Sequence, residues 1–403
     1  MTSNGRDLTI RPGVILGPAI MRGGVPVHVV HNAEEDCYYQ IGEREYFIIE
    51  KLKRGFELDQ ISLLYANTFG KTLGEKSWLQ IATLLDDKGL LLASGLDDTP
   101  KNCKKSLSRQ WGLISGKFGL FDPNPLLAKI EHNFPWMLSK RALVVSLMSF
   151  VALCLVVALN FESMADKIGH LLVEYPTATV LVVLVMVVVL FFHEMGHALA
   201  CVAAGSDCRE IGIAWRIPMF YFYTATSDVY LVSAKRRVMI SAAGMLVGSL
   251  ALLPFVVVYL FLGEGIWVQV IASILYVGFF ASVINLIPFF CLDGQKILSH
   301  SLAVWDVSAE GKAWLLNLAK RKVPREGFSF GVKIFAIFEL FAMAAMAVCG
   351  TWWWFAFLTP KVGIPWTALI LILVWLGAGS ILVVFVLRNR RNRYGDSYFK
   401  SDS

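Results

Sequence analysis

The HEMGH string at positions 193–197 combines side chains that can bind a metal ion with one that can move a proton. On a helix, His193 and His197 lie on the same face one turn apart, so both imidazoles can coordinate one ion. Glu194 between them can take a proton from a water molecule that the ion activates. The string follows a nearly uninterrupted apolar run at residues 178–192. Ionisable groups beside such a run are costly to keep without a function. This favours a catalytic site over histidines that merely hydrogen-bond within a bundle.

A catalytic zinc ion needs three protein ligands and one open position. Asp293 is the best candidate for the third ligand, because it ends a long apolar run in the string NLIPFFCLDG at positions 285–294. The remaining histidines lie in the soluble region, the connector, an outer loop or past the fourth predicted span, and they serve less well.

Six apolar segments are long enough to cross a hydrocarbon core, which takes about 20 helical residues. They cover roughly residues 142–159, 178–204, 238–262, 266–290, 334–357 and 366–387. An even number places both termini on one side. The segments between spans on that side are rich in Lys and Arg, whereas the outer loops hold only Lys167 and Lys361. The positive-inside rule therefore predicts cytoplasmic termini in the cell membrane. The second and fourth spans then end at the inner face, with HEMGH and LDG at similar depth.

Composition agrees with a membrane protein. The 403 residues are 56% hydrophobic and only 17% charged, whereas soluble proteins carry about 25% charged residues. The polar opening, residues 1–11, has no secretory signal, so we expect a cytoplasmic N-terminal module. Seven scattered cysteines without a CxxC pair predict reduced thiols. The net charge of +6 lies mostly beside the membrane, which indicates topology rather than nucleic-acid binding.

The N-terminal module alternates strand and helix patterns. Residues 25–30 and 37–41 predict strands, residues 47–53, 58–66 and 77–91 predict helices, and a wing-like strand follows. This order resembles a PqqD-like winged-helix domain, which would imply leader-peptide binding in ribosomal-peptide maturation. An unspecialised winged helix used for packing or docking fits the pattern equally well. The predicted domains are a winged-helix-like cytoplasmic domain (1–96), a basic aromatic connector at headgroup level (97–139), a six-span domain (140–390) and a basic cytoplasmic tail (391–403).

HExxH in one span and NxxPxxxLDG in a later one resemble the site-2 protease family of intramembrane zinc metalloproteases, over roughly residues 177–295. The resemblance implies that His193, His197 and Asp293 hold one Zn²⁺ and that Glu194 is the general base. It also implies that Asn285 lies beside the scissile carbonyl. Pro288 is expected to unwind the fourth helix locally.

The sequence also departs from the family pattern. Many relatives carry AGP and then Asn early in the third core span, whereas here the run is AGMLVG at positions 243–248, which keeps only the Gly. This predicts a variant branch with altered substrate handling. The loops are too short for a PDZ-like insertion. The aromatic segment 211–232 resembles the family's membrane-associated hairpin, and an interfacial aromatic belt fits it equally well.

Together these features predict an α-helical polytopic membrane protein with a small α+β N-terminal domain. Its expected activity is hydrolysis of peptide bonds in membrane-embedded or membrane-delivered substrates. The expected partners are the lipid bilayer, a membrane protein or peptide substrate, and an exporter or peptide-maturation partner on the N-terminal domain, with no nucleic acid. The alternative is a membrane-anchored peptide-recognition or exporter-assembly protein without proteolytic turnover. A transporter is disfavoured because no inverted repeat is visible.

Overall fold

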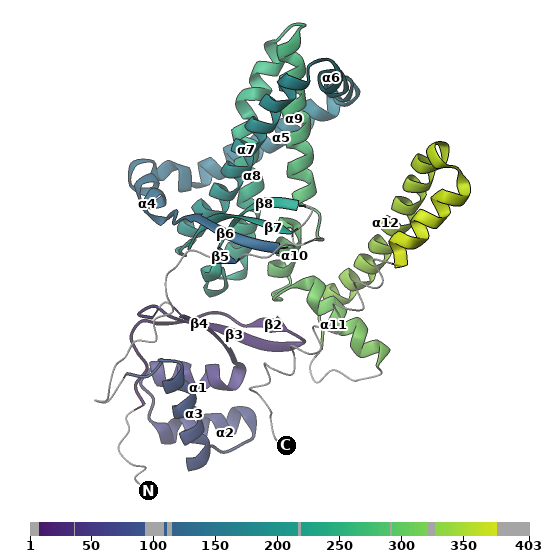
Figure 1. Ribbon diagram of the computed structural model, residues 1–403. Helices are drawn as coiled ribbons and strands as arrows, with labels where there is room; N and C mark the ends of the chain where they lie inside the picture. The colour runs from purple at the N-terminus through teal and green to yellow at the C-terminus, as the bar shows by residue number, and fades with distance from the viewer. Residues whose placement is uncertain are drawn as a thin grey trace. The chain divides into compact units, whose positions relative to one another are not determined.

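The computed structural model describes residues 8–35, 37–92, 109–110, 115–216, 219–290, 292–320 and 327–376. Helices dominate these residues, and a small β-sheet lies near the N-terminus (Figure 1). The chain divides into two compact units, Met1–Lys333 and Ile334–Ser403. Five helices are long and apolar enough to cross a membrane, which makes this a multi-pass membrane protein.

The N-terminal sheet is built around one long strand. Its strands are β1 (Val14–Leu16), β2 (Ile20–Arg22), β3 (Val25–Asn32) and β4 (Cys37–Gly42). β3 pairs antiparallel with the other three. The β2–β3 turn consists of Gly23 and Gly24, with φ of 65° and 78°. Glycine adopts this left-handed backbone at low cost, and a two-residue turn of this kind closes a tight hairpin. The predicted strands at 25–30 and 37–41 are confirmed, whereas β1 and β2 are too short for an alternating pattern to reveal them.

Three helices pack with this sheet: α1 (Glu43–Lys53), α2 (Leu58–Phe69) and α3 (Glu75–Asp87). They confirm the helices predicted from residues 47, 58 and 77. Their buried core includes Ile48, Ile49, Ile61 and Leu85 beside Val30 of β3. Apolar residues at three- and four-residue spacing on each helix therefore form the interior of the domain.

The region after α3 differs from the prediction in two ways. Of the wing-like strand, the structure describes a single bridge between Ile10 and Leu91, and residues 93–108 lie outside the described part. The expectation of reduced thiols is wrong at Cys37, which is disulfide-bonded. Cys154, Cys201, Cys208 and Cys349 are free.

A second sheet contains both part of the connector and the aromatic segment. Its strands are β5 (Arg109–Gln110), β6 (Ser115–Phe121), β7 (Ile211–Arg216) and β8 (Met219–Thr224), in that order across the sheet. β7 and β8 form an antiparallel hairpin, and β6 pairs antiparallel with β7. Part of the predicted 97–139 connector is therefore a structural strand. After β6 come α4 (Asn124–Asn133) and a short 3-10 helix (Pro135–Leu138).

The membrane helices agree with five of the six predicted segments. They are α5 (Lys140–Leu159), α7 (Pro176–Ala203), α8 (Ala234–Phe261), α9 (Ile266–Asn285) and α12 (Phe330–Val362). The sixth segment is described only as an apolar helix at Ile364–Leu376, and residues from 377 onward lie outside the described part. Within the second unit, Trp375 Nε1 donates to Thr351 Oγ1 at 3.0 Å, which joins this helix to α12. An additional helix, α6 (Phe161–Glu174), lies in the expected outer loop.

Helices α7 and α8 approach each other closely at a glycine. A Cβ on Gly196 would lie 2.6 Å from the carbonyl oxygen of Ala243 and 2.9 Å from Cβ of Val247. Only a residue without a side chain lets the two backbones come so near. The contact lies within the HEMGH string, so it sets the distance between that string and α8.

After α9 the chain reverses direction before two short helices, α10 (Asp293–Ser301) and α11 (Val307–Ala319). The predicted interruption near Pro288 is confirmed, because α9 ends at Asn285. Phe290 has a φ of 59°, a left-handed conformation that helps turn the chain. The reversal places Asp293 at the start of a new helix rather than inside the span.

The hairpin β2–β3 is bound to the segment between α10 and α11. Met21 N donates to the carbonyl of Ala303 and Trp305 N donates to the carbonyl of Met21, each at 2.9 Å. The N–H groups of Gly23 and Gly24 both donate to the buried carboxylate of Glu310, the latter at 3.0 Å. The N-terminal domain is thus attached by this contact in addition to the chain that follows it.

Candidate metal centre

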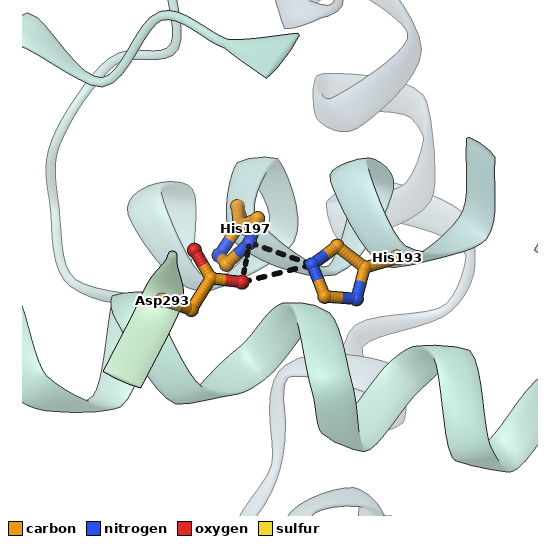
Figure 2. Close-up of side chains that lie close together, drawn as sticks. All are labelled: His193, His197 and Asp293. Carbon is orange, nitrogen blue, oxygen red and sulfur yellow. Dashed lines mark hydrogen bonds and ion pairs between the residues drawn. The ribbon is translucent and has the colours of Figure 1, made fainter. Parts of the chain in front are cut away.

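Three buried side chains from two distant segments converge at the C-terminal part of α7, beside the N-terminal half of α8. His193 and His197 project from α7, and Asp293 is the first residue of α10 (Figure 2). Asp293 Oδ2 lies 2.9 Å from His193 Nε2 and 3.1 Å from His197 Nε2. The two Nε2 atoms are 3.3 Å apart. The structure therefore brings together the three residues predicted as metal ligands.

The tautomer of His197 follows from its second ring nitrogen. Nδ1 lies 2.8 Å from the carbonyl oxygen of Ile240, which can only accept, so Nδ1 carries the hydrogen in the neutral ring. Nε2 then presents a lone pair to His193 and to the carboxylate of Asp293. Lone pairs that face one another repel unless a proton or a cation lies between them. A backbone carbonyl that fixes the ring of a metal-binding histidine in this way is common in metal sites.

The distances fit one small cation. Ligand atoms about 2.0–2.2 Å from a tetrahedral ion lie about 3.3–3.6 Å from each other, close to the 2.9, 3.1 and 3.3 Å found here. Two imidazoles and one carboxylate are a donor set that suits a divalent transition metal. The buried group could therefore bind a metal ion.

The second oxygen of Asp293 is also held. Lys296, one turn later on α10, lies with Nζ 2.9 Å from Oδ1. Burial by itself would raise the pKa of Asp293, but when protons rather than a metal ion lie between the rings and the carboxylate, the charge of His197, the hydrogen bonds from both histidines and the charge of Lys296 together lower that pKa below its ordinary value. Asp293 is therefore ionised and held with Oδ2 toward the imidazoles.

A glycine on α8 leaves room for the imidazoles. A Cβ on Gly244 would overlap Nε2 of His197 and would lie 2.7 Å from Nε2 of His193. By contrast, a Cβ on Gly248, one turn later, would lie 3.6 Å from Cβ of His193, an ordinary contact. Gly244 is thus the glycine of this part of α8 at which a side chain would collide with the imidazoles.

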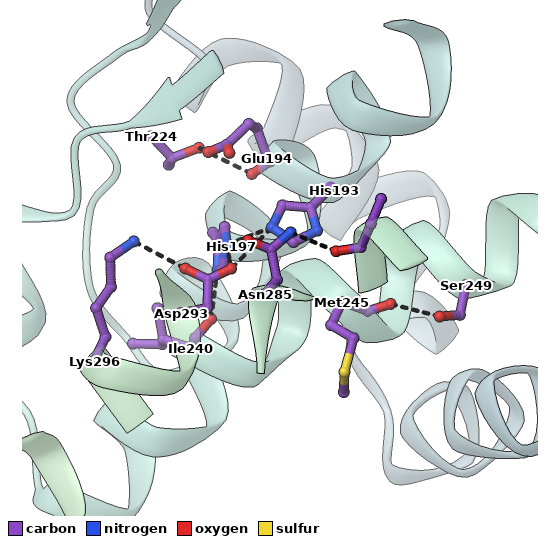
Figure 3. A network of polar contacts seen from close by, with 11 residues as sticks. His193, Glu194, His197, Thr224, Ile240, Met245, Ser249, Asn285, Asp293 and Lys296 are labelled. Atoms are coloured by element: carbon purple, nitrogen blue, oxygen red, sulfur yellow. Dashed lines mark hydrogen bonds and ion pairs between the residues drawn. The ribbon is translucent and has the colours of Figure 1, made fainter. Parts of the chain in front are cut away.

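Glu194 lies next to this group and is bound by a residue of the second sheet. Thr224 Oγ1 donates to Glu194 Oε2 at 2.6 Å and lies 3.0 Å from the Glu194 backbone carbonyl oxygen (Figure 3). Glu194 is only partly buried, unlike the three candidate ligands. It can therefore be reached by water while it stays adjacent to both histidines.

Asn285, the last residue of α9, bonds within its own helix. Its Nδ2 donates to the carbonyl oxygen of Ala281 at 3.1 Å (Figure 3). No hydrogen bond from Asn285 to the histidines or Asp293 is found among the described residues. A role at a substrate carbonyl would require this amide to exchange its partner.

Sequence reasoning missed Thr224 and Lys296. Lys296 carried a weak signal, because a Lys three residues after an Asp on a helix can reach it. Thr224 carried none, since its contact with Glu194 depends on how the second sheet packs against α7. His300, two turns after Asp293 on α10, is buried but is not part of the group that could hold a metal.

The fold and the site define a multi-pass membrane protein with a buried His–His–Asp group that could bind a metal ion. No protein-family model, curated protein or solved structure matches the chain.

Proposed function

We propose that this protein is an intramembrane zinc metalloendopeptidase that hydrolyses peptide bonds of membrane-embedded or membrane-delivered proteins or peptides. The observation that carries the proposal is the convergence of His193, His197 and Asp293 beside Glu194 at the end of an apolar helix. Two histidines and a carboxylate with an adjacent glutamate are the parts of a metalloprotease site. The motifs' resemblance to the site-2 protease family supports the same reading.

The residues divide the chemistry among them. His193, His197 and Asp293 would hold Zn²⁺, which when bound would lower the pKa of a water molecule and polarise the peptide carbonyl. The Glu194 carboxylate takes a proton from the attacking water and then gives it to the nitrogen of the leaving amine. Asn285 would turn its Nδ2 from Ala281 to the substrate oxygen and stabilise the negative charge that develops there.

The sixth span expected at residues 366–387, of which the structure describes the apolar helix Ile364–Leu376, would place both termini in the cytoplasm and the protein in the cell membrane. The N-terminal domain, read as a PqqD-like winged helix, would capture a leader peptide or dock an exporter or maturation partner. The edge of β4 supports this: β4 pairs only with β3 within the described residues, so a peptide would add as a further strand on its other side.

A cleavage assay tests the proposal. The wild-type protein and Glu194→Gln are reconstituted in liposomes with Zn²⁺ and a panel of single-span reporter proteins whose helices carry Gly or Pro near the inner face. Products are identified by mass spectrometry. Wild type should cut at least one reporter within its span, and Glu194→Gln should retain zinc while losing turnover by about 10²- to 10⁴-fold. Equal background from both proteins across the panel, with zinc bound, would overturn the proteolytic function and favour recognition or assembly without turnover.

A further inference from the structure

The hydroxyl of Thr224 is the described side chain that hydrogen-bonds the Glu194 carboxylate. Its Oγ1 lies 2.6 Å from Oε2, a short separation typical of a hydroxyl that donates to an ionised carboxylate. The two residues are 30 positions apart and belong to different elements, β8 and α7. Figure 3 shows the two side chains pointing toward each other.

The position of Thr224 is fixed by the sheet. It is the last residue of β8 and pairs with Ile211, a fully buried residue that begins β7. A β-branched side chain in a paired strand has few rotamers available. The hydroxyl is therefore presented to Glu194 by a rigid element rather than by a loop, which is how supporting groups fix a catalytic side chain.

The same hydroxyl faces a second acceptor, the backbone carbonyl oxygen of Glu194, at 3.0 Å. A threonine hydroxyl has one hydrogen to donate and two lone pairs to accept with. While Glu194 is a carboxylate, the hydrogen points to Oε2. The hydroxyl is therefore held against both the side chain and the backbone of Glu194, which limits the positions that this carboxylate can adopt.

We propose that Thr224 is a positioning residue for the general base, which holds the Glu194 carboxylate in one orientation beside the candidate metal ligands. The inference rests on the proposed proteolytic function and deepens it. It assigns to the end of β8 a role in catalysis that is separate from any contact of that strand with substrate. Loss of the hydroxyl should therefore lower turnover and leave substrate binding largely unchanged.

The test compares four proteins on a reporter that wild type cleaves: wild type, Thr224→Val, Thr224→Ser and Thr226→Val. Valine keeps the branched shape of threonine without the hydroxyl, and serine keeps the hydroxyl. Thr226, two residues later, has no side-chain hydrogen bond as the cap of the following 3-10 helix, so its variant is the matched control. We expect Thr224→Val to lower kcat by about 10- to 100-fold, the effect of losing one hydrogen bond to a charged group. KM should change less than twofold, and Thr224→Ser should restore kcat to within about threefold.

Zinc content and thermal stability are measured for each protein, and Thr224→Ala replaces the valine variant if that variant does not fold. A folded, zinc-loaded, hydroxyl-free variant with wild-type kcat would overturn the inference while leaving the protease intact. An effect on KM alone, or an equal loss in Thr224→Ser, would likewise overturn it, because either result assigns Thr224 to substrate contact or packing. Failure of wild type and Thr226→Val to cleave any reporter would instead count against the proposed function itself.

Discussion

His193 and Asp293 are 100 residues apart, yet Nε2 of the first lies 2.9 Å from Oδ2 of the second. The contact joins the C-terminal part of a long membrane helix to the first residue of a short helix that follows a break in the chain's helical structure. Each side chain has a further partner that orients it: the neighbouring imidazole of His197 for His193 and the Lys296 ammonium for Asp293. Contacts within the protein therefore hold the three side chains together.

Metal binding is the first test of this arrangement. Purified protein should hold about one Zn²⁺ per chain, and His193→Ala or Asp293→Ala should lose it, because two ligands rarely retain zinc against a chelator. Metal content is measured by mass spectrometry after dialysis against a mild chelator. His170→Ala, at an exposed histidine of α6, is the control and should keep the metal. Full retention in both ligand variants would rule the site out.

Gly244 and Gly248 provide a matched pair on one helix. Alanine favours a helix over glycine by about 1 kcal/mol at either position, but only at Gly244 does the new Cβ collide with the imidazoles. We expect Gly244→Ala to weaken zinc binding by about 10- to 100-fold, in line with overpacking of about 1–3 kcal/mol. Gly248→Ala should leave affinity within about threefold. Competition with a fluorescent chelator measures the zinc dissociation constant of each variant. Equal affinities would show that α8 shifts to accommodate the new Cβ at Gly244.

Glu310 should control attachment of the N-terminal hairpin. Glu310→Ala removes the acceptor for the backbone N–H groups of Gly23 and Gly24, so amide exchange at these two residues should accelerate by roughly 10- to 100-fold. Hydrogen exchange with mass spectrometry measures this in the full-length protein. The exposed Glu75→Gln on α3 is the control. Unchanged protection of the hairpin would mean that the strand contacts with Ala303 and Trp305 suffice.

His300 predicts a pH dependence of stability. Burial, together with the charges of Arg237 and Lys296, lowers its pKa from 6.5 to about 4. The unfolded chain therefore binds a proton on this residue at a higher pH than the folded chain does. The contribution of His300 to the free energy of unfolding is therefore fully present above pH 6.5. This contribution is lost as the pH falls toward 4, by about 3 kcal/mol in all. Thermal unfolding of zinc-loaded wild type and His300→Gln between pH 7 and pH 4.5 should show a smaller loss of Tm in the variant. An equal loss of Tm in both proteins would show that a residue other than His300 causes the pH dependence.

Topology can be tested by labelling single cysteines in a cysteine-free background. A membrane-impermeant maleimide applied from outside should reach cysteines placed at Lys167 and Lys361 and should miss those at Lys320 and Arg391, because basic residues concentrate on the inner side. Permeabilised cells are the control, in which all four should label. The reverse pattern would move the metal centre to the outer face.

Local patterns in the sequence determined much of this protein. Apolar runs of about 20 residues identified five spanning helices, and the i, i+4 spacing placed His193 and His197 on one helical face. Alternating and helical periodicities located β3, β4 and the three helices of the N-terminal domain. These features follow from contacts within a single element, so periodicity and spacing reveal them.

The role of Asp293 could be predicted from the sequence only in part. Its pairing with HEMGH followed from span direction, because a carboxylate and two histidines at one depth can meet. The distances and the tautomer of His197, however, depend on how closely α7 and α8 pack at Gly196.

Only the tertiary structure decided the rest. The pairing of β6 with β7, the attachment of Met21 to the segment beside α11, and the contact of Thr224 with Glu194 all join residues far apart in sequence. Such contacts are set by which surfaces pack together, and no period within a strand or helix records them. The side chains that could bind the metal could therefore be predicted from the sequence. The side chains that orient Glu194 and attach the N-terminal domain could not.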